Sequence, residues 1–173
     1  MRVRHEGYKQ MIEVGDPIPD AQLQTLVNER VTTFSIREKL KNRKVVIFAV
    51  PGAFTPGCTR VHLPGYVKYA TEIKAKGFDG IYCLSVNDAY VMNAWGLSAN
   101  ALDHVEMLAD GSAQFVTKLG LAVDLSKYGM GTRSQRFSMT LEDCIVRSLQ
   151  IDAHTIQKTS AVFTCGLSEV NEV

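Results

Sequence analysis

Cys58 is the residue best placed to do chemistry, and it lies in the segment 50–60, VPGAFTPGCTR. Two prolines restrict the backbone of this loop, and a helical pattern begins at the cysteine. Free backbone N–H groups and the positive end of the helix dipole favour an anion in a first helical turn, so we expect a reactive thiolate. The Thr55 hydroxyl can donate to this sulfur or to an oxygen bound beside it, while Pro51 and Phe54 can cover the site.

Three further cysteines, Cys83, Cys144 and Cys165, are candidates for redox chemistry with Cys58. No two of the four are spaced as Cys-x-x-Cys, so the sequence favours neither a zinc ribbon nor a thioredoxin-type dithiol. Cys83 lies in an apolar run typical of a buried strand, where a thiol is usually inert. Cys144 lies in a predicted turn and is interpreted as a bystander. The four histidines share no ligand spacing, and no metal site is expected.

The elements that must position Cys58 alternate between strands and helices. Continuous apolar runs over 44–50 (KVVIFAV) and 80–86 (GIYCLSV) predict strands buried on both faces of a parallel sheet. The pattern predicts a three-layer α/β fold with a central mixed sheet flanked by helices. Ligands of such sheets bind beyond the carboxyl ends of the strands, where the loop after Val50 lies. The other predicted strands are 21–27 and 30–34, an N-terminal hairpin, then 105–109, and a second hairpin of 136–141 and 145–151 across Glu142 and Asp143.

Helices are predicted between these strands. Ser35 and Glu38 form a capping box that begins a short helix ending near Asn42. A long helix is expected from 58 to about 76, with a kink at Pro64. The remaining predicted helices are 88–95, capped by Asn87 and Asp88 and ended by Gly96, then 112–119, and a last one within 158–172.

The composition excludes several classes of protein. The chain has 173 residues, of which 46% are hydrophobic and 21% charged, and these values predict a single globular domain over 1–173. A formal net charge of +1 gives no attraction to nucleic acid or to an anionic membrane surface. No apolar run approaches the roughly 20 residues that cross a bilayer. The start, MRVRHEGYKQ, lacks the apolar core of a secretory signal, so a cytoplasmic location is expected; an organelle form without its leader would look the same.

Several ordered motifs resemble those of one known family. The run VPGAFTPGC resembles the Pro-x-x-x-Thr-x-x-Cys active-site motif of peroxiredoxins. The HLPG that follows at 62–65 is similar to the type II, or peroxiredoxin-5-like, subfamily. The likeness covers roughly residues 12–168 and continues at 83–88 (CLSVND), 92–96 (MNAWG), 109–111 (ADG) and 136–139 (RFSM).

This resemblance implies a thioredoxin-like fold and a thiol peroxidase that reduces hydrogen peroxide, organic hydroperoxides and peroxynitrite. Cys58 matches the peroxidatic cysteine, Thr55 and Pro51 match the other motif positions, and Arg136 matches an arginine that reaches the site from a strand. A fixed guanidinium and a hydroxyl donor would stabilise the charge that develops on the O–O pair during thiolate attack. The resemblance also implies a homodimer, a thiol reductant (thioredoxin, glutaredoxin or glutathione), and no metal or organic cofactor.

The resemblance leaves open which thiol resolves the sulfenic acid of Cys58. One branch of the subfamily uses a cysteine at the position of Cys83, and another uses one in a Thr-Cys context near the C-terminus, similar to Thr164-Cys165. A third branch uses an external thiol. We favour Cys165, because local unfolding costs little near the end of a chain.

Alternatives to the other roles are also open. Arg133 is the rival of Arg136 for the catalytic arginine, and His62 is either a base or, as we favour, a structural donor. At the level of function, the rivals are a general disulfide oxidoreductase, a redox sensor or holdase that uses Cys58, and a scaffold with a vestigial site. The absence of a cysteine three residues from Cys58 disfavours the oxidoreductase.

Overall fold

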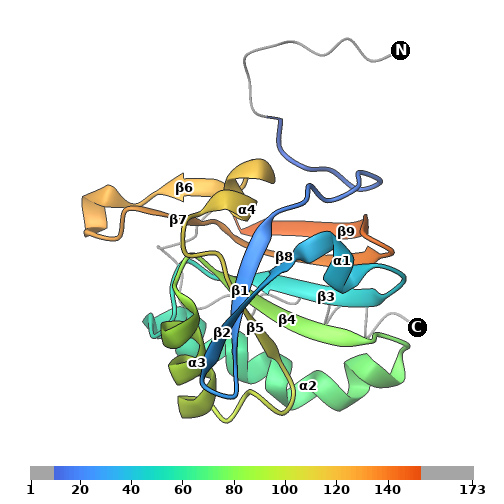
Figure 1. Cartoon of the computed structure of the whole chain (residues 1–173), viewed down its shortest axis with the longest axis horizontal. Helices are drawn as coiled ribbons and strands as arrows, with labels where there is room; N and C mark the ends of the chain where they lie inside the picture. The colour runs from blue at the N-terminus through green and yellow to red at the C-terminus, as the bar shows by residue number, and fades with distance from the viewer. Residues whose placement is uncertain (1–9, 153–173) are drawn as a thin grey trace.

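The structure is a computed structural model that describes residues 10–152. Its centre is a mixed sheet of seven strands in the order β2-β1-β5-β4-β3-β8-β9 (Figure 1). The strands are β1 (Gln22–Val27), β2 (Arg30–Ser35), β3 (Lys44–Ala49), β4 (Gly80–Ser85), β5 (Glu106–Ala109), β8 (Arg136–Glu142) and β9 (Ile145–Asp152). The middle strands β3, β4 and β5 are parallel, whereas the two hairpins at the edges are antiparallel. The predicted mixed sheet with its N-terminal hairpin is therefore confirmed.

Helices cover both faces of this sheet, as the sequence predicts. Figure 1 shows α2 (Leu63–Ala75) and α3 (Ala89–Ser98) on one face, and α1 (Ile36–Leu40) and α4 (Gln114–Lys118) on the other. Ser35 caps α1 by accepting a hydrogen bond from the backbone N–H of Glu38, as its place in the capping box predicts. Among the described residues, no helix is both long enough and apolar enough to span a bilayer.

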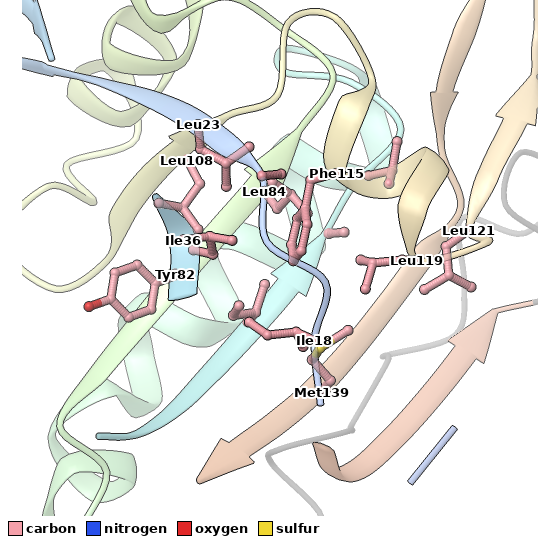
Figure 2. Packing of buried hydrophobic residues seen from close by; sticks show 14 of the residues in the cluster. Ile18, Leu23, Ile36, Tyr82, Leu84, Leu108, Phe115, Leu119, Leu121 and Met139 are labelled. Carbon is pink, nitrogen blue, oxygen red and sulfur yellow. The ribbon is translucent and has the colours of Figure 1, made fainter. Parts of the chain in front are cut away.

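The two faces of the sheet carry separate hydrophobic clusters. On the α1 and α4 face, Leu23, Ile36, Leu84 and Phe115 belong to one cluster, and Figure 2 shows these side chains converging between the sheet and α4. On the α2 and α3 face, a second cluster includes the fully buried side chain of Trp95 together with Cys58 itself. The strand runs read from the sequence are apolar on both faces because each face packs against one of these clusters.

The directions of the strands explain where the site forms. The loop that leads to Cys58 follows the end of β3. Because β8 runs antiparallel to β3, with Ala49 opposite Phe137, the first residue of β8, Arg136, lies beside that same end. The parallel strand β4 also ends at this edge, and Asn87 follows it. Three segments that are far apart in the chain therefore meet at one edge of the sheet.

Some predicted elements differ from the observed ones. The helix expected to end at Gly96 continues to Ser98, because this glycine packs inside α3, where an added Cβ would come within 2.4 Å of Leu102. The second hairpin turns one residue later than predicted, at Asp143 and Cys144, which have positive φ values of 48° and 64°. Such a two-residue turn matches the twist of the strands that it joins.

A small second sheet was not predicted at all. It consists of β6 (Ala122–Asp124) and β7 (Thr132–Ser134), which are joined through the single 3-10 turn η2 (Ser126–Tyr128). Strands of this length carry too few residues for an alternating pattern to be recognised. The helix predicted within 158–172 lies outside the described residues.

Candidate active site

Cys58 lies in the first turn of the helix that follows the loop after β3. Two helical residues, Pro56 and Gly57, precede it, and residues Cys58–His62 form a π-helical turn, η1, before α2 starts. The Cys58 side chain is fully buried. A kink was predicted at Pro64; the proline occupies the start of α2, directly after this π-turn, where its missing N–H costs little.

Arg136 reaches the sulfur of Cys58 from the first position of β8. Its Nη2 donates to Cys58 Sγ at 3.5 Å, and the arginine is itself 7% exposed. Asp152 lies opposite Arg136 in the neighbouring strand β9, and its Oδ2 is 3.9 Å from Arg136 Nε. A carboxylate beside the guanidinium helps hold the cation in this orientation. The structure thus brings together the two residues that the sequence paired only by resemblance.

His62 contacts the same arginine from the end of the π-turn. Arg136 Nη1 lies 2.6 Å from His62 Nδ1, and because a guanidinium only donates, Nδ1 accepts and carries no proton. The carbonyl of Gly57 lies 3.1 Å from the same nitrogen and would bond it only if it were protonated. Burial lowers the pKa of His62, and the charge of Arg136 lowers it further. These contacts make His62 a structural partner of Arg136, and its role as a donor stays a prediction.

Thr55 and Pro51 lie in the loop between β3 and the helix. The Thr55 hydroxyl donates to the Gly52 carbonyl at 2.8 Å, so its single proton points to the loop backbone rather than to the sulfur. The carbonyl of Thr55 accepts from the N–H of Thr59 at 3.0 Å and thereby begins the helix of Cys58. Pro51 is buried, whereas Phe54 is 53% exposed and has a φ of +63°. Of the two expected covering residues, only Pro51 is enclosed.

Side chains at the end of β4 and just beyond it anchor this loop, and sequence reasoning gave Asn87 only a helix-capping role. The Asn87 side-chain oxygen accepts from the backbone N–H of Ala53 at 3.0 Å and from the Ser85 hydroxyl at 2.7 Å. Both residues belong to the CLSVND motif at 83–88. Their position at the carboxyl end of a buried strand was the available signal, because polar residues there lie at the ligand edge of the sheet.

Two further hydrogen bonds fix the helix that carries Cys58. Trp95 Nε1 in α3 donates to the hydroxyl of Thr59 at 3.0 Å, next to the nucleophile. The Tyr66 hydroxyl in α2 donates to the Ser138 hydroxyl in β8 at 3.0 Å, two residues after Arg136. The helix is therefore tied both to α3 and to the strand that presents the arginine. Trp95 is buried and also supports the site.

The remaining cysteines lie in different surroundings. Cys83 is fully buried in β4, and its pKa is raised well above the usual value, mainly by burial and further by the proximity of Cys58. Cys144 lies at the β8–β9 turn, where its thiol donates to the Arg37 carbonyl at 3.4 Å, away from the site. Cys58, Cys83 and Cys144 are all free thiols, and Cys165 lies outside the described residues. Within residues 10–152, no three His, Cys, Asp or Glu side chains are grouped so that they could hold a metal ion.

The arrangement suits attack by sulfur on a polarised bond. A single nucleophilic atom faces a buried cation that is held by a carboxylate and an imidazole. A guanidinium in such a dry site stabilises charge that develops in the transition state with little reorganisation. The chemistry needs no proton acceptor other than the group that leaves.

Similarity to known proteins agrees with this geometry. The family model for redoxins matches residues 13–162. Peroxiredoxin-2B of Arabidopsis thaliana is 42% identical over 143 residues, which are 82% of this chain and 88% of that protein. The structure of reduced Prx3 from Vibrio vulnificus in complex with H2O2 has a TM-score of 0.84 and 43% identity, covering 91% of this chain and 99% of that one. Peroxiredoxin 5 from Alvinella pompejana has a TM-score of 0.79 and 33% identity, covering 94% and 99%. The chain therefore belongs to the redoxin family and is a type II peroxiredoxin, a thiol-dependent peroxidase with a thioredoxin-like fold.

Proposed function

We propose that Cys58 is the peroxidatic residue and that it reduces hydrogen peroxide, organic hydroperoxides and peroxynitrite. The thiolate attacks the terminal peroxide oxygen, an S–O bond forms, and the O–O bond breaks. Sulfur loses two electrons and becomes a sulfenic acid. The second oxygen leaves as hydroxide or alkoxide, which takes up a proton, or, from peroxynitrous acid, within nitrite. The observation that carries this proposal is the 3.5 Å contact between Arg136 Nη2 and Cys58 Sγ. The relative from Vibrio vulnificus was solved in complex with H2O2, which supports hydrogen peroxide as one substrate.

Arg136, Thr55 and Pro51 complete the proposed site. Arg136 stabilises the negative charge that moves onto the O–O pair, because its guanidinium is already aimed at the sulfur. The Thr55 hydroxyl donates to the bound peroxide after it rotates away from the Gly52 carbonyl. Pro51 is buried and keeps bulk water from the sulfur. Since Cys58 is fully buried, peroxide must enter through a local opening of the loop or the first helical turn.

We propose Cys165 as the thiol that resolves the sulfenic acid of Cys58, with release of water. Cys83 is the alternative, because it belongs to the same buried cluster as Cys58. Its full burial and its raised pKa both disfavour a thiolate there, which supports the choice of Cys165. The disulfide would then be reduced by thioredoxin, glutaredoxin or glutathione.

A homodimer is also part of the proposal. Large apolar side chains are exposed in the active-site loop and in α3: Phe54 is 53% exposed, Tyr90 63% and Leu97 61%. The bond between Asn87 and Ala53 places the start of α3 against this loop, so these side chains lie on neighbouring segments. An exposed apolar surface of this kind suits contact with a second copy. Sedimentation should show a dimer that Phe54→Glu weakens; a wild-type monomer at working concentration would contradict this.

Turnover tests the enzyme proposal. Wild-type protein should consume hydrogen peroxide steadily with a thiol reductant, Cys58→Ser should abolish consumption, and Cys144→Ser should not change it. Consumption limited to a single stoichiometric oxidation would favour the redox sensor instead. Peptide mapping after one equivalent of peroxide should show a Cys58–Cys165 disulfide. A Cys58–Cys83 peptide would replace the proposed resolving residue, and no internal bond would favour an external thiol.

A further inference from the structure

We infer that Arg133 is a positioning residue that holds the active-site loop in its reactive shape. The inference rests on the proposed role of Cys58. Arg133 lies in β7 of the small sheet, and its guanidinium donates in two directions. Nε donates to the carbonyl of Met130 at 2.9 Å, and Nη1 donates to the carbonyl of Pro51 at 3.3 Å. One planar group therefore ties the β6–β7 hairpin to the first residue of the catalytic loop.

The loop leaves space for this guanidinium only because residue 52 is glycine. A Cβ added at Gly52 would lie 2.9 Å from Arg133 Nη1, 3.1 Å from Thr55 Cγ2 and 3.4 Å from Met130 Cε. Gly52 is buried, and its φ does not lie in the left-handed region, so close packing rather than backbone strain requires the missing side chain. Arg133 on one side and Thr55 on the other thus enclose this glycine.

The restraint continues from Arg133 to the nucleophile through short steps. The carbonyl of Gly52 accepts from the Thr55 hydroxyl at 2.8 Å, and the carbonyl of Thr55 accepts from the N–H of Thr59 in the helix of Cys58. The Ala53 N–H is held separately by Asn87. Arg133 consequently fixes the end of the loop that lies before Gly52, where Asn87 does not act. None of the ion pairs formed within residues 10–152 includes Arg133, so both of its bonds serve backbone carbonyls.

A misplaced loop should slow peroxide reduction more than it slows alkylation of the Cys58 sulfur. Peroxide reduction needs the Thr55 hydroxyl, the Arg136 guanidinium and the sulfur in register around a small substrate, and errors of about 1 Å in such arrangements cost on the order of 100-fold in rate. Alkylation by iodoacetamide needs the same local opening to reach the buried thiolate, but not the Thr55 and Arg136 donors. A structural defect would change both reactions, whereas a positioning defect changes only the first.

The test compares Arg133→Ala and Arg133→Lys with Arg147→Ala, an exposed arginine paired with Glu142 on the surface. The rate of Cys58 oxidation by hydrogen peroxide and the rate of its alkylation are measured in each variant. Arg133→Ala should slow oxidation by about 10- to 100-fold and leave alkylation within about twofold of wild type. Arg133→Lys should recover part of the loss, since one ammonium can reach one carbonyl but cannot match the fork. Arg147→Ala should match wild type in both.

A double-mutant cycle with Gly52→Ala tests the contact directly. Gly52→Ala should slow oxidation in the wild-type background and cost clearly less once Arg133→Ala has removed the clash. Unchanged oxidation in Arg133→Ala, equal losses in oxidation and alkylation, or a strictly additive cycle would each overturn the inference. If wild-type Cys58 itself did not react with peroxide, the proposed function would fail instead, so the two failures are distinguishable.

Discussion

At the scale of single residues, the site depends on one cation that serves three neighbours. Arg136 points one nitrogen at Cys58 Sγ, another at His62 Nδ1, and a third toward Asp152. The carboxylate and the neutral imidazole hold the guanidinium in place, and the guanidinium places a positive charge beside the sulfur. The state of His62 therefore matters to the site through Arg136.

Replacing Arg136 should slow peroxide reduction without abolishing it. Loss of a donor aimed at developing charge costs on the order of 100- to 1000-fold in rate. Arg136→Lys should be less damaging than Arg136→Ala, because a positive charge remains. Stopped-flow kinetics give the rate of Cys58 oxidation in both Arg136 variants, with Arg147→Ala as the surface control. Rates within about threefold of wild type in Arg136→Ala would contradict the assigned role.

His62 should make the folded state less stable in mild acid. Its pKa is lowered by burial and by Arg136, so the unfolded chain binds this proton more readily than the folded protein. The stability that the neutral imidazole contributes is complete above its ordinary pKa of about 6.5 and is lost as the pH falls below that value. Urea denaturation of reduced protein should show a larger loss between about pH 7.5 and 5.5 for wild type than for His62→Gln. Equal losses would show that His62 does not carry the effect.

At the scale of elements, the helix of Cys58 is held where three segments meet. The π-turn η1 rests on α3 through the bond between Trp95 and Thr59, while α2 is joined to β8 through Tyr66 and Ser138. The ring of Tyr66 also stacks on Phe48 of β3, with centroids 3.8 Å apart. The helix that carries Cys58 and the strand that carries Arg136 are thus joined by hydrogen bonds.

Thr59→Val should destabilise this junction. The substitution keeps the shape of the side chain but leaves the buried indole N–H of Trp95 without its acceptor, at a cost of about 1–3 kcal/mol. Trp95 is the single tryptophan of the chain, so its fluorescence follows unfolding in urea directly. Thr71→Val, on the exposed side of α2, is the matched control and should change the free energy of unfolding by less than about 0.5 kcal/mol. A Thr59→Val protein as stable as the control would show that the bond contributes nothing.

At the scale of the whole molecule, both faces of the sheet carry a hydrophobic cluster, but only one of the two clusters contains the nucleophile. The cluster with α1 and α4 contains no residue of the proposed site, whereas the cluster with α2 and α3 contains Cys58. Loss of packing in the first cluster should therefore lower global stability while native protein keeps its reactivity.

Phe115→Ala tests this separation. Phe115 is fully buried in α4, and removing its ring should cost about 3–5 kcal/mol of unfolding free energy. Tyr128→Ala, an aromatic residue that is 51% exposed, should cost little. At a temperature where both variants remain folded, their Cys58 oxidation rates should equal that of wild type. A slowed Phe115→Ala enzyme with intact fold would show that the two faces are coupled.

The sequence predicted the parts of this molecule that depend on local pattern. The apolar runs of β3 and β4, the cap of Ser35 and the position of Cys58 at a helix start all follow from short-range rules, and the structure confirms them. The pairing of Arg136 with Cys58 came only through resemblance, because it depends on the antiparallel register of β8 against β3.

The missed features are those set by distant contacts. The sequence named Asn87 only as a helix cap and Arg133 only as a rival catalytic arginine. Their hydrogen bonds to the loop join segments more than 30 residues apart, and no local pattern encodes them. The small β6–β7 sheet is too short to show a period, yet it carries Arg133. The π-turn at Cys58 likewise reflects the meeting of a helix start with Pro64 rather than a propensity of its five residues.

The most direct test of the central claim is to trap the sulfenic acid at its site of formation. A Cys165→Ser variant is treated with one equivalent of hydrogen peroxide in the presence of dimedone, and the labelled peptide is identified by mass spectrometry. The account predicts a dimedone adduct on Cys58, which forms more slowly when Arg136→Ala is added. An adduct on Cys83 or Cys144 with Cys58 unmodified would contradict it.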